Sequence, residues 1–402
     1  ILSMHTSPLA QPGTGDGGGM NVYVRELATA LARAGVRSDV YTRADGSQPA
    51  YVDVEPGLRV HHIAAGPLGP VDKHDLPGLV DEFADGVQAR IAAGNPADAL
   101  HANYWLSGVA GHELKHRLEL PLVSTFHTLD RVKAEADASD DNESRVKAEV
   151  RTMACSDAIL ASGVDEVHQL VRLYDVDRSR IEIVAPGVDH AFFAPGDRRQ
   201  ARRAIGLPVD SPVLLSVGRI QPLKGLDVAI RAASLLRSTH RGLVLVIVGG
   251  PSGVDGLAEL DRLHALVDEL DMGDHVRFVA PQPHELLSSY YRAADVCLVP
   301  SRTESFGLVA LEAAACGTPV VAAAVGGLRT LVRHALTGFL VEGRAPGAFA
   351  SFAGEILDNQ NLAEEMSGHA ARVARDFTWS IAAARLRRLY GNLTARQLVE
   401  CP

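Results

Sequence analysis

Short apolar runs alternate along the whole chain with longer stretches in which apolar residues recur every three or four positions. The short runs have the length of buried strands, and the longer stretches have the spacing of amphipathic helices. Strands and helices that alternate in this way form parallel sheets covered by helices on both faces. The pattern predicts an α/β protein with two Rossmann-like, doubly wound parallel-sheet domains that face each other across a cleft.

The expected elements fall into two series separated by a segment rich in proline and glycine at 185–197. Strands are expected at 1–4, 40–42, 58–63, 97–102, 122–126, 158–161 and 181–185, and then at 212–218, 243–248, 276–279, 296–299 and 320–323. Helices are expected over 22–35 and 76–91, and between most other strands. The expected domains are therefore 1–190 and 191–376. The last segment, 377–402, holds a helix that crosses back to the first domain or, alternatively, closes the second.

Residues 301–313 read as a loop and a helix that follow the strand at 296–299. Glu304 lies in the loop and Glu312 in the helix. The amides that open this helix, those of Ser305, Phe306 and Gly307, are expected to form an anion site. Two carboxylates beside such a site suit a sugar nucleotide, with Glu304 on sugar hydroxyls and Glu312 on the ribose diol.

The alternative is that Glu304 only caps the helix and that Glu312 lies on a solvated face. The neighbours of Glu312 are small or apolar, and a lone carboxylate among them is costly unless it has a partner. This surrounding favours a ligand-binding role.

Arg219 and Lys224 flank the loop that follows the strand at 212–218. A guanidinium and an ammonium group on one loop match a diphosphate, although either cation alone is more often solvated. Such groups stabilise the charge that develops on a departing nucleoside diphosphate, and they need no metal for this. The residues therefore predict a nucleotide-sugar transferase.

The first half carries a second set of polar residues where its strands end. The glycines at 17–19 stand between a strand and a helix, where backbone amides approach a phosphate closely, although a flexible loop is the alternative. Polar side chains follow other strands, and cations stand nearby. These residues are His5, Asn103, Tyr104, His127 and Thr128, with Lys73, Arg145 and Lys147 as the cations. An anionic acceptor would suit this half.

The composition limits the class of protein. A length of 402 residues allows two or three domains, and the net charge of −10 argues against general nucleic-acid binding. No apolar run reaches the roughly 18 residues that a membrane helix needs, and no signal peptide is expected. The four cysteines are scattered without metal-ligand spacing, and Cys297 and Cys316 read as core residues. A reducing cytoplasm is the expected location.

Over its whole length the chain resembles the retaining glycosyltransferases of the GT-B fold. Glu304 and Glu312, with seven residues between them, match the acidic signature, and residues 217–219 and 224–225 match the diphosphate motif. More narrowly, the chain resembles the D-inositol 3-phosphate glycosyltransferases, which open mycothiol synthesis in actinobacteria. This resemblance is carried by residues 3–9, 11–16, 18–23, 76–77, 104–108, 127–129, 219–224, 249–253 and 304–309, and by Lys73.

The resemblance implies the substrates and the residue roles. The donor would be UDP-N-acetylglucosamine and the acceptor 1D-myo-inositol 3-phosphate, with the anomeric configuration kept because a donor phosphate oxygen takes the acceptor proton on the same face. Catalysis would involve His127, Arg219, Lys224 and Glu304. The donor would be bound by Gln11, Pro12, Gly19, Arg219, Lys224, Gln282, Glu304, Ser305, Phe306, Gly307 and Glu312. The acceptor would be bound by His5, Asp16, Asn21, Lys73, Tyr104, Thr128 and Arg145.

The resemblance implies no cofactor for the chemistry, but it does imply a structural magnesium ion. Its site would be formed by Tyr291, Arg292, Ala294 and Thr318. Homodimerisation is left open.

The chain departs from the family pattern mainly on the acceptor side. His101-Ala102-Asn103 stands where the family has His-Ser-His, Asp130-Arg131 replaces a small pair, and Gln282 replaces an arginine. Residues 135–151 match poorly, and residues 135–143 read as a solvated loop. Two alternatives therefore stay open. The acceptor could be another cyclitol or a sugar phosphate, as in sucrose-phosphate synthases, or the chain could bind a nucleotide sugar without catalysis.

Overall fold

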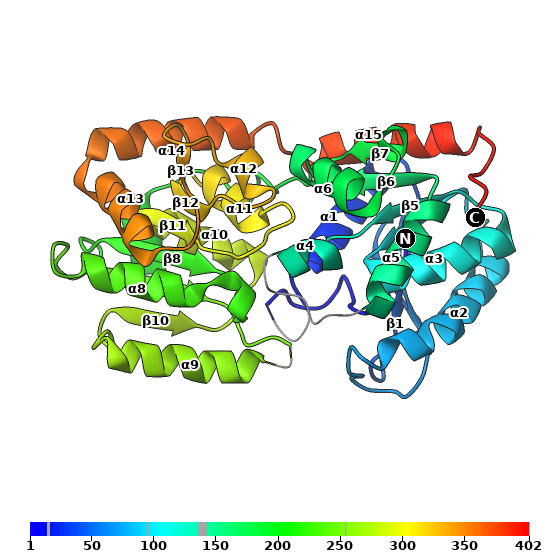
Figure 1. Ribbon diagram of the computed structural model, residues 1–402, viewed down its shortest axis with the longest axis horizontal. Helices are drawn as coiled ribbons and strands as arrows, with labels where there is room; N and C mark the ends of the chain where they lie inside the picture. The colour runs from blue at the N-terminus through cyan, green and yellow to red at the C-terminus, as the bar shows by residue number, and fades with distance from the viewer. Residues whose placement is uncertain (14–16, 95, 136–142, 254, 402) are drawn as a thin grey trace. The chain divides into compact units, whose positions relative to one another are not determined.

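A computed structural model describes residues 1–13, 17–94, 96–135, 143–253 and 255–401 (Figure 1). The chain forms two compact units. The first unit contains residues 1–10, 19–186 and 379–402, and the second contains residues 11–18 and 187–378. The long segment of the first unit therefore ends at residue 186, four residues before the expected boundary at 190. The short segment 11–18 groups with the second unit, although the residues before and after it belong to the first.

Among the described residues, the first unit contains seven strands in two hydrogen-bonded groups. The strands are β1 (Ser38–Arg43), β2 (Tyr51–Glu55), β3 (Leu58–Ile63), β4 (Leu100–Asn103), β5 (Leu122–Thr125), β6 (Ala158–Ala161) and β7 (Ile181–Ile183). Their orders are β1-β3-β2 and β4-β5-β6-β7. Leu2 joins the two groups, because it forms parallel bridges to Tyr41 of β1 and to Ala102 of β4. The amino-terminal segment thus takes the place of a strand between β1 and β4.

Strand β2 was not expected from the sequence, and it pairs antiparallel to β3, so this sheet is not wholly parallel. In its second half valines alternate with acidic residues, and all its residues are exposed or half-buried. A strand of this kind contains no apolar run. It is recognised only once β3 is in place beside it.

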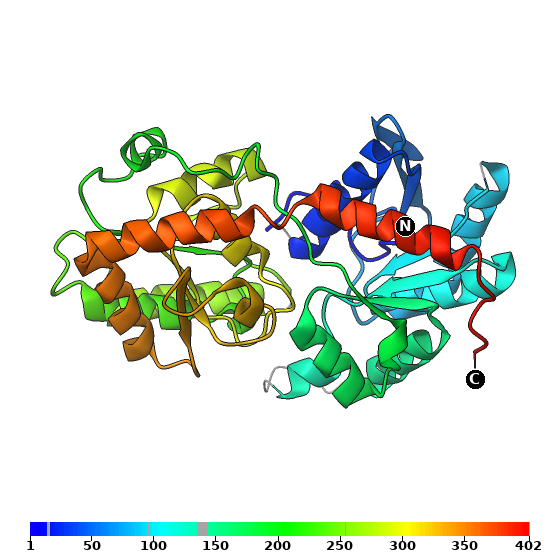
Figure 2. The ribbon, with the colours of Figure 1, turned by 90° about the horizontal axis from the view of Figure 1, so that it is seen from above.

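Helices cover the sheet of the first unit. They are α1 (Gly19–Arg33), the 3-10 turn η1 (Leu76–Leu79), α2 (Val80–Ala93), α3 (Trp105–Leu118), α4 (Asp130–Glu135), α5 (Glu143–Cys155), α6 (Val164–Tyr174), η2 (Arg178–Arg180) and α15 (Trp379–Leu393). Helix α15, the last of the chain, packs against α1, the first (Figure 2). Trp379 and Leu386 of α15 share a buried cluster with Val24 and Leu27 of α1.

In the part of the second unit that the structure describes, six parallel strands form one sheet. They are β8 (Val213–Val217), β9 (Val244–Val248), β10 (Val276–Val279), β11 (Val296–Val299), β12 (Val320–Ala323) and β13 (Gly338–Val341), in the order β10-β9-β8-β11-β12-β13. The helices are α7 (Arg198–Ala204), η3 (Pro222–Lys224), α8 (Leu226–Leu236), α9 (Gly256–Glu269), α10 (His284–Ala293), α11 (Leu308–Ala315), α12 (Leu328–Leu331), α13 (Pro346–Asp358) and α14 (Gln360–Ala374). Strand β13, which begins with glycine, was not expected from the sequence.

The direction of winding reverses once in each unit. In the second unit the chain moves from β8 outward to β9 and from β11 outward to β12, so the loops after β8 and β11 diverge. In the first unit the reversal falls between the amino-terminal segment and β4. Ligands of doubly wound sheets bind at such a switch point, outside the carboxyl ends of the strands.

Within the described ranges, none of the helices combines the length and the apolar character that crossing a bilayer requires.

Candidate active site

A lysine and a glutamate meet at the switch point of the second unit. The Lys224 Nζ atom, on the loop after β8, lies 2.7 Å from Glu304 Oε2, on the loop after β11. Both side chains are about one-fifth exposed. The pair is held in place, yet a ligand can reach it, so the structure brings together two residues that the sequence assigned to one site from different motifs.

Two glycines allow the loop after β8 to approach the loops after β11 and β9 closely. Gly225, with φ of 66°, ends the turn that carries Lys224, and a Cβ atom on it would lie 2.2 Å from the carbonyl oxygen of Pro300. Gly249, with φ of 159°, follows β9, and a Cβ atom there would lie 1.8 Å from the carbonyl oxygen of Gly218. Any side chain at either position would force the loops apart.

The loop of Glu304 rests on a second pair of glycines. The Gly327 amide donates to the Glu304 carbonyl at 3.1 Å. A Cβ atom on Gly327 would lie 2.4 Å from the Cα atom of Phe306, and a Cβ atom on Gly326 would lie 2.0 Å from the Glu304 carbonyl oxygen. The position of the Glu304 loop therefore depends on close backbone packing.

Helix α11 begins later than the sequence predicted. It starts at Leu308, because Gly307 adopts φ of 100° and so ends the preceding loop as the N-cap residue. The amides of Ser305 and Phe306 consequently lie in the loop and not in the first helical turn. The expectation that they open the helix is wrong, and the amides that open α11 are those that follow Gly307.

Glu312 lies on α11 as expected, but it is buried and has protein partners. Its Oε1 atom lies 2.9 Å from His284 Nε2, and its Oε2 atom accepts a hydrogen bond from the Tyr291 hydroxyl at 2.7 Å. These two groups, seven residues apart on α10, offset the cost of burying the carboxylate. No pattern in the sequence pointed to them. Each carboxylate oxygen keeps acceptor capacity for a second donor, so contact with a ribose hydroxyl stays a prediction.

Arg219 lies at the other end of the loop that carries Lys224, and Gly18 lies beside it. A Cβ atom on Gly18 would lie 3.0 Å from Arg219 Nε. The Gln11 amide donates to the Gln282 carbonyl at 2.9 Å, and the Gln282 amide in turn donates to the Ala280 carbonyl. The structure thus places Gln11, with its neighbour Pro12, beside the loop after β10. Gly19 begins α1, and Asp16 lies outside the described residues.

Four of the predicted acceptor residues come together at the switch point of the first unit. Arg145 donates through Nη2 to the carbonyl and the hydroxyl of Thr128, at 2.9 and 3.1 Å. Its Nη1 lies 3.4 Å from the Tyr104 hydroxyl, and the Tyr104 ring stands 4.3 Å from the ring of His5. Arg145 is buried and also pairs with Glu149 at 2.8 Å, so part of its charge is already compensated.

The remaining predicted acceptor residues have other surroundings. The buried Asn21 amide donates to the Thr6 hydroxyl and the Ser7 carbonyl, so Asn21 holds the loop that follows the amino-terminal segment. Lys73 is exposed on the loop before η1. Lys147 forms an exposed pair with Glu143, 2.7 Å apart on the same helix.

His127 lies beside this acceptor cluster with a strained backbone, at φ of 59°. Its Nε2 atom lies 2.9 Å from Asn103 Oδ1, and its ring forms a T-shaped pair with the ring of Tyr23, with the two centroids 4.8 Å apart. Burial lowers the pKa of His127 to about 3, so the ring is neutral near pH 7. A neutral imidazole can exchange hydrogen bonds with a sugar hydroxyl, but it has no proton to give as an acid.

His101, on β4, is buried. It bridges the Tyr390 hydroxyl and the Thr125 hydroxyl, both at 2.8 Å, and burial lowers its pKa to about 3. Between pH 6.5 and 3 the unfolded chain therefore binds a proton here that the folded chain does not, so stability falls as the pH falls. We expect His101 to account for a loss of about 2 kcal/mol in the free energy of unfolding between pH 7 and pH 5.

Urea unfolding of the wild type and of His101→Gln at pH 7 and pH 5 measures this contribution. The pH-dependent loss should be smaller in the variant by that amount. His74→Gln, at an exposed position, is the control and should retain the loss of the wild type. Equal losses in the wild type and His101→Gln would contradict the burial of a neutral ring.

The predicted magnesium residues lie around the carboxyl end of α10. The Thr318 hydroxyl donates to the Tyr291 carbonyl at 2.6 Å, and the Ala294 amide donates to the same carbonyl at 3.2 Å. The Arg292 guanidinium donates to the Ala194 carbonyl. The four residues offer neutral oxygens and no carboxylate, whereas magnesium in proteins is usually bound through one or two carboxylates. The donor set therefore fits magnesium poorly.

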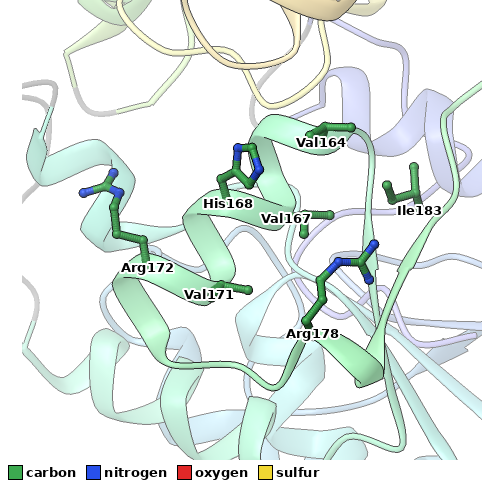
Figure 3. A pocket seen from close by; sticks show the side chains of 7 residues that line it. All are labelled: Val164, Val167, His168, Val171, Arg172, Arg178 and Ile183. Atoms are coloured by element: carbon green, nitrogen blue, oxygen red, sulfur yellow. The ribbon is translucent and has the colours of Figure 1, made fainter.

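A pocket with a volume of about 600 Å³ lies on the first unit, apart from the residues discussed above. Figure 3 shows valines along one face of α6, with Ile183 of β7 across from them and Arg178 between. The lining residues are Val164, Val167, His168, Val171, Arg172, Arg178 and Ile183. The pocket is almost wholly apolar and shares no residue with the candidate site.

Comparisons with known proteins agree with this arrangement. Residues 197–373 match the family described as Glycosyl transferases group 1, and residues 17–192 match Glycosyltransferase Family 4. The chain is 47% identical over 402 residues to D-inositol 3-phosphate glycosyltransferase 2 of Catenulispora acidiphila, covering 98% of this chain and 94% of that protein. It is 47% identical over 386 residues to the D-inositol 3-phosphate glycosyltransferase of Mycolicibacterium smegmatis, covering 94% of this chain and 87% of that protein.

Solved structures show the same fold. The sucrose-phosphate synthase of Thermosynechococcus elongatus superposes with a TM-score of 0.91 at 33% identity, covering 98% of each chain. The Anabaena protein HepE, in complex with UDP and glucose, superposes with a TM-score of 0.79 at 19% identity, covering 98% of this chain and 99% of that one. The chain therefore belongs to the D-inositol 3-phosphate glycosyltransferase family, within the group 1 glycosyltransferases of the GT-B fold.

Proposed function

We propose that the chain transfers N-acetylglucosamine from UDP-N-acetylglucosamine to 1D-myo-inositol 3-phosphate and keeps the anomeric configuration. The observation that carries the proposal is the Lys224–Glu304 pair at the switch point of the second unit, with Arg219 at the other end of the Lys224 loop. A diphosphate and a sugar are the two parts of the donor that such cations and such a carboxylate would bind.

The second unit binds the donor. Arg219 and Lys224 face the diphosphate, Glu304 accepts hydrogen bonds from hydroxyls of the transferred sugar, and Glu312 meets the ribose. The bond between the anomeric carbon and the diphosphate oxygen breaks, and the two cations stabilise the charge left on that oxygen. The new bond forms between the anomeric carbon and an acceptor hydroxyl oxygen, whose proton passes to a donor phosphate oxygen.

The first unit binds the acceptor. The hydroxyls of Tyr104 and Thr128, with the Arg145 guanidinium between them, are donors for the acceptor phosphate. His127, neutral and held by Asn103, orients the transferred sugar.

An acceptor panel tests the proposal, with UDP release as the readout. We expect 1D-myo-inositol 3-phosphate to react far faster than myo-inositol, because the neutral ring lacks the phosphate that the first unit binds. Turnover of myo-inositol at an equal rate would overturn the proposed acceptor. If a sugar phosphate such as fructose 6-phosphate reacts faster, the proposed acceptor is wrong, but the proposed donor is unaffected.

Removal of one hydroxyl should weaken acceptor binding selectively. We expect Tyr104→Phe to raise KM for the phosphorylated acceptor about tenfold or more, because it deletes one hydrogen bond to a charged group, and to leave KM for the donor unchanged. Initial rates at varied acceptor measure the change. Tyr51→Phe, at a 45% exposed tyrosine of β2, is the matched control and should behave as the wild type. An unchanged acceptor KM in Tyr104→Phe would remove this hydroxyl from the site.

A further inference from the structure

Two histidines and two cysteines converge in the first unit, away from the candidate active site. His112 and His116 stand one turn apart on α3, Cys155 ends α5, and Cys401 lies in the tail after α15. One ligand atom from each residue lies within 4.8 Å of the others. The cysteines show no metal-ligand spacing in the sequence, because 246 residues separate Cys155 from Cys401, but the fold brings their two side chains together.

A buried lysine fixes both segments that carry the cysteines. Lys115, on α3 between the two histidines, is 1% exposed and donates to the carbonyls of Cys155 and Val399, at 2.8 and 3.0 Å. It also pairs with Asp157 at 2.8 Å, and Asp157 accepts from the Val399 amide at 2.7 Å. The helix that presents the histidines thus also positions the end of α5 and the tail.

The sulfur atoms of the two cysteines do not provide hydrogen-bond partners for both imidazoles. Cys155 and Cys401 form a disulfide in the structure. His116 Nε2 lies 3.1 Å from the Cys401 sulfur, and the His116 ring lies 5.0 Å from that of His112. His112 is only 7% exposed, and its Nδ1 atom is buried without a hydrogen-bond partner among the described residues. Buried polar atoms in folded proteins normally have a partner, and a disulfide supplies none here.

We propose that the reduced chain binds one zinc ion through His112, His116, Cys155 and Cys401. Two thiolates and two imidazoles form a donor set typical of structural zinc sites, in which four protein ligands leave no position open for catalysis. In such a tetrahedron the ligand atoms lie roughly 3.3–3.8 Å apart, so the observed cluster needs only small shifts once the sulfur atoms separate.

Besides the neighbouring imidazole, the cations that act on His112 are Arg151 and Lys115. Two thiolates neutralise the ion, and the ammonium of Lys115 is already compensated by Asp157. A dithiol reductant breaks the bond between the two sulfur atoms and is itself oxidised to a disulfide, which leaves two thiols on the chain. Zinc binding then releases the two thiol protons. The ion ties the tail to α3 and α5.

The test uses the full chain, reduced and handled without oxygen, with zinc alone as the probe. After removal of unbound metal we expect one zinc ion per chain by elemental analysis, and substitution by cobalt should give the visible absorption of a tetrahedral site together with a thiolate charge-transfer band. Zinc should also raise the melting temperature of the reduced chain. Cys401→Ser and His112→Ala should each lose the stoichiometric ion.

Two controls separate the site from chance binding. Cys401→Ser alters only the tail and should keep the UDP-release rate of the wild type, which shows that the variant is folded. His168→Ala, at an exposed histidine of α6, should retain one zinc ion. Zinc content equal in wild type and Cys401→Ser, an octahedral cobalt spectrum, or a disulfide that persists under strong reductant would each overturn the proposal.

Discussion

Lys224→Ala is expected to lower kcat/KM for UDP release by about 10²- to 10³-fold, the usual loss when one preorganised donor to a developing charge is removed. The free energy of unfolding should change by no more than about 1 kcal/mol, because the ion pair with Glu304 is partly exposed and such pairs contribute little stability. Steady-state kinetics and urea unfolding of the same preparation measure the two effects separately.

The chain offers a matched control for this variant. Lys147 pairs with Glu143 at the same distance, 2.7 Å, on the exposed surface of α5. Lys147 lies in this exposed pair and not in the cluster of Arg145, Thr128, Tyr104 and His5, so Lys147→Ala removes an ion pair of the same length outside both proposed sites and should leave the rate unchanged. The assignment of Lys224 fails if both variants lose rate equally, or if Lys224→Ala is unfolded by circular dichroism.

Gly327→Ala should have the second largest effect, on both activity and stability. The new methyl group would lie 2.4 Å from the Cα atom of Phe306, so the loop that carries Glu304 must move. Overpacking of this kind costs about 1–3 kcal/mol, and a displacement of about 1 Å in a positioned group can cost about 100-fold in rate. We expect both losses, read from urea unfolding and from UDP release.

Gly368→Ala is the control for the same chemical change. Gly368 lies on α14, and a methyl group added there would meet no described atom within 4 Å beyond its own stretch of helix. Alanine at this position should therefore stabilise the helix slightly and leave the rate unaltered. Wild-type activity and stability in Gly327→Ala would show that the Glu304 loop does not depend on close backbone contact.

The parts of the site that depend on local pattern could be predicted from the sequence. Strand β11, the loop of Glu304 and the helix that carries Glu312 follow one another without interruption over residues 296–315, and apolar runs and glycines mark their limits. The family resemblance linked this stretch to Lys224. The start of α11 was misplaced because Gly307 adopts a left-handed conformation, where an added Cβ atom would meet Leu328 of α12, and no local pattern reveals this.

The remaining features depend on contacts between distant parts of the chain. His284 and Tyr291 become partners of Glu312 only when α10 and α11 pack together. Strand β2 has no apolar run of its own, and Cys155 and Cys401 meet only after α15 has been placed on the first unit. In each case the interacting residues carry no mark in the sequence, since their role arises from the tertiary structure.

The position of α15 determines the order in which the two units can complete their folding during synthesis. Residues 379–402 belong to the unit that begins at residue 1, and α15 supplies part of the hydrophobic core around α1. The ribosome delivers those residues only after the whole of the second unit has emerged. The unit begun first is thus the one finished last, and until then the apolar face of α1 lacks its cover and is exposed to chaperones and to premature association.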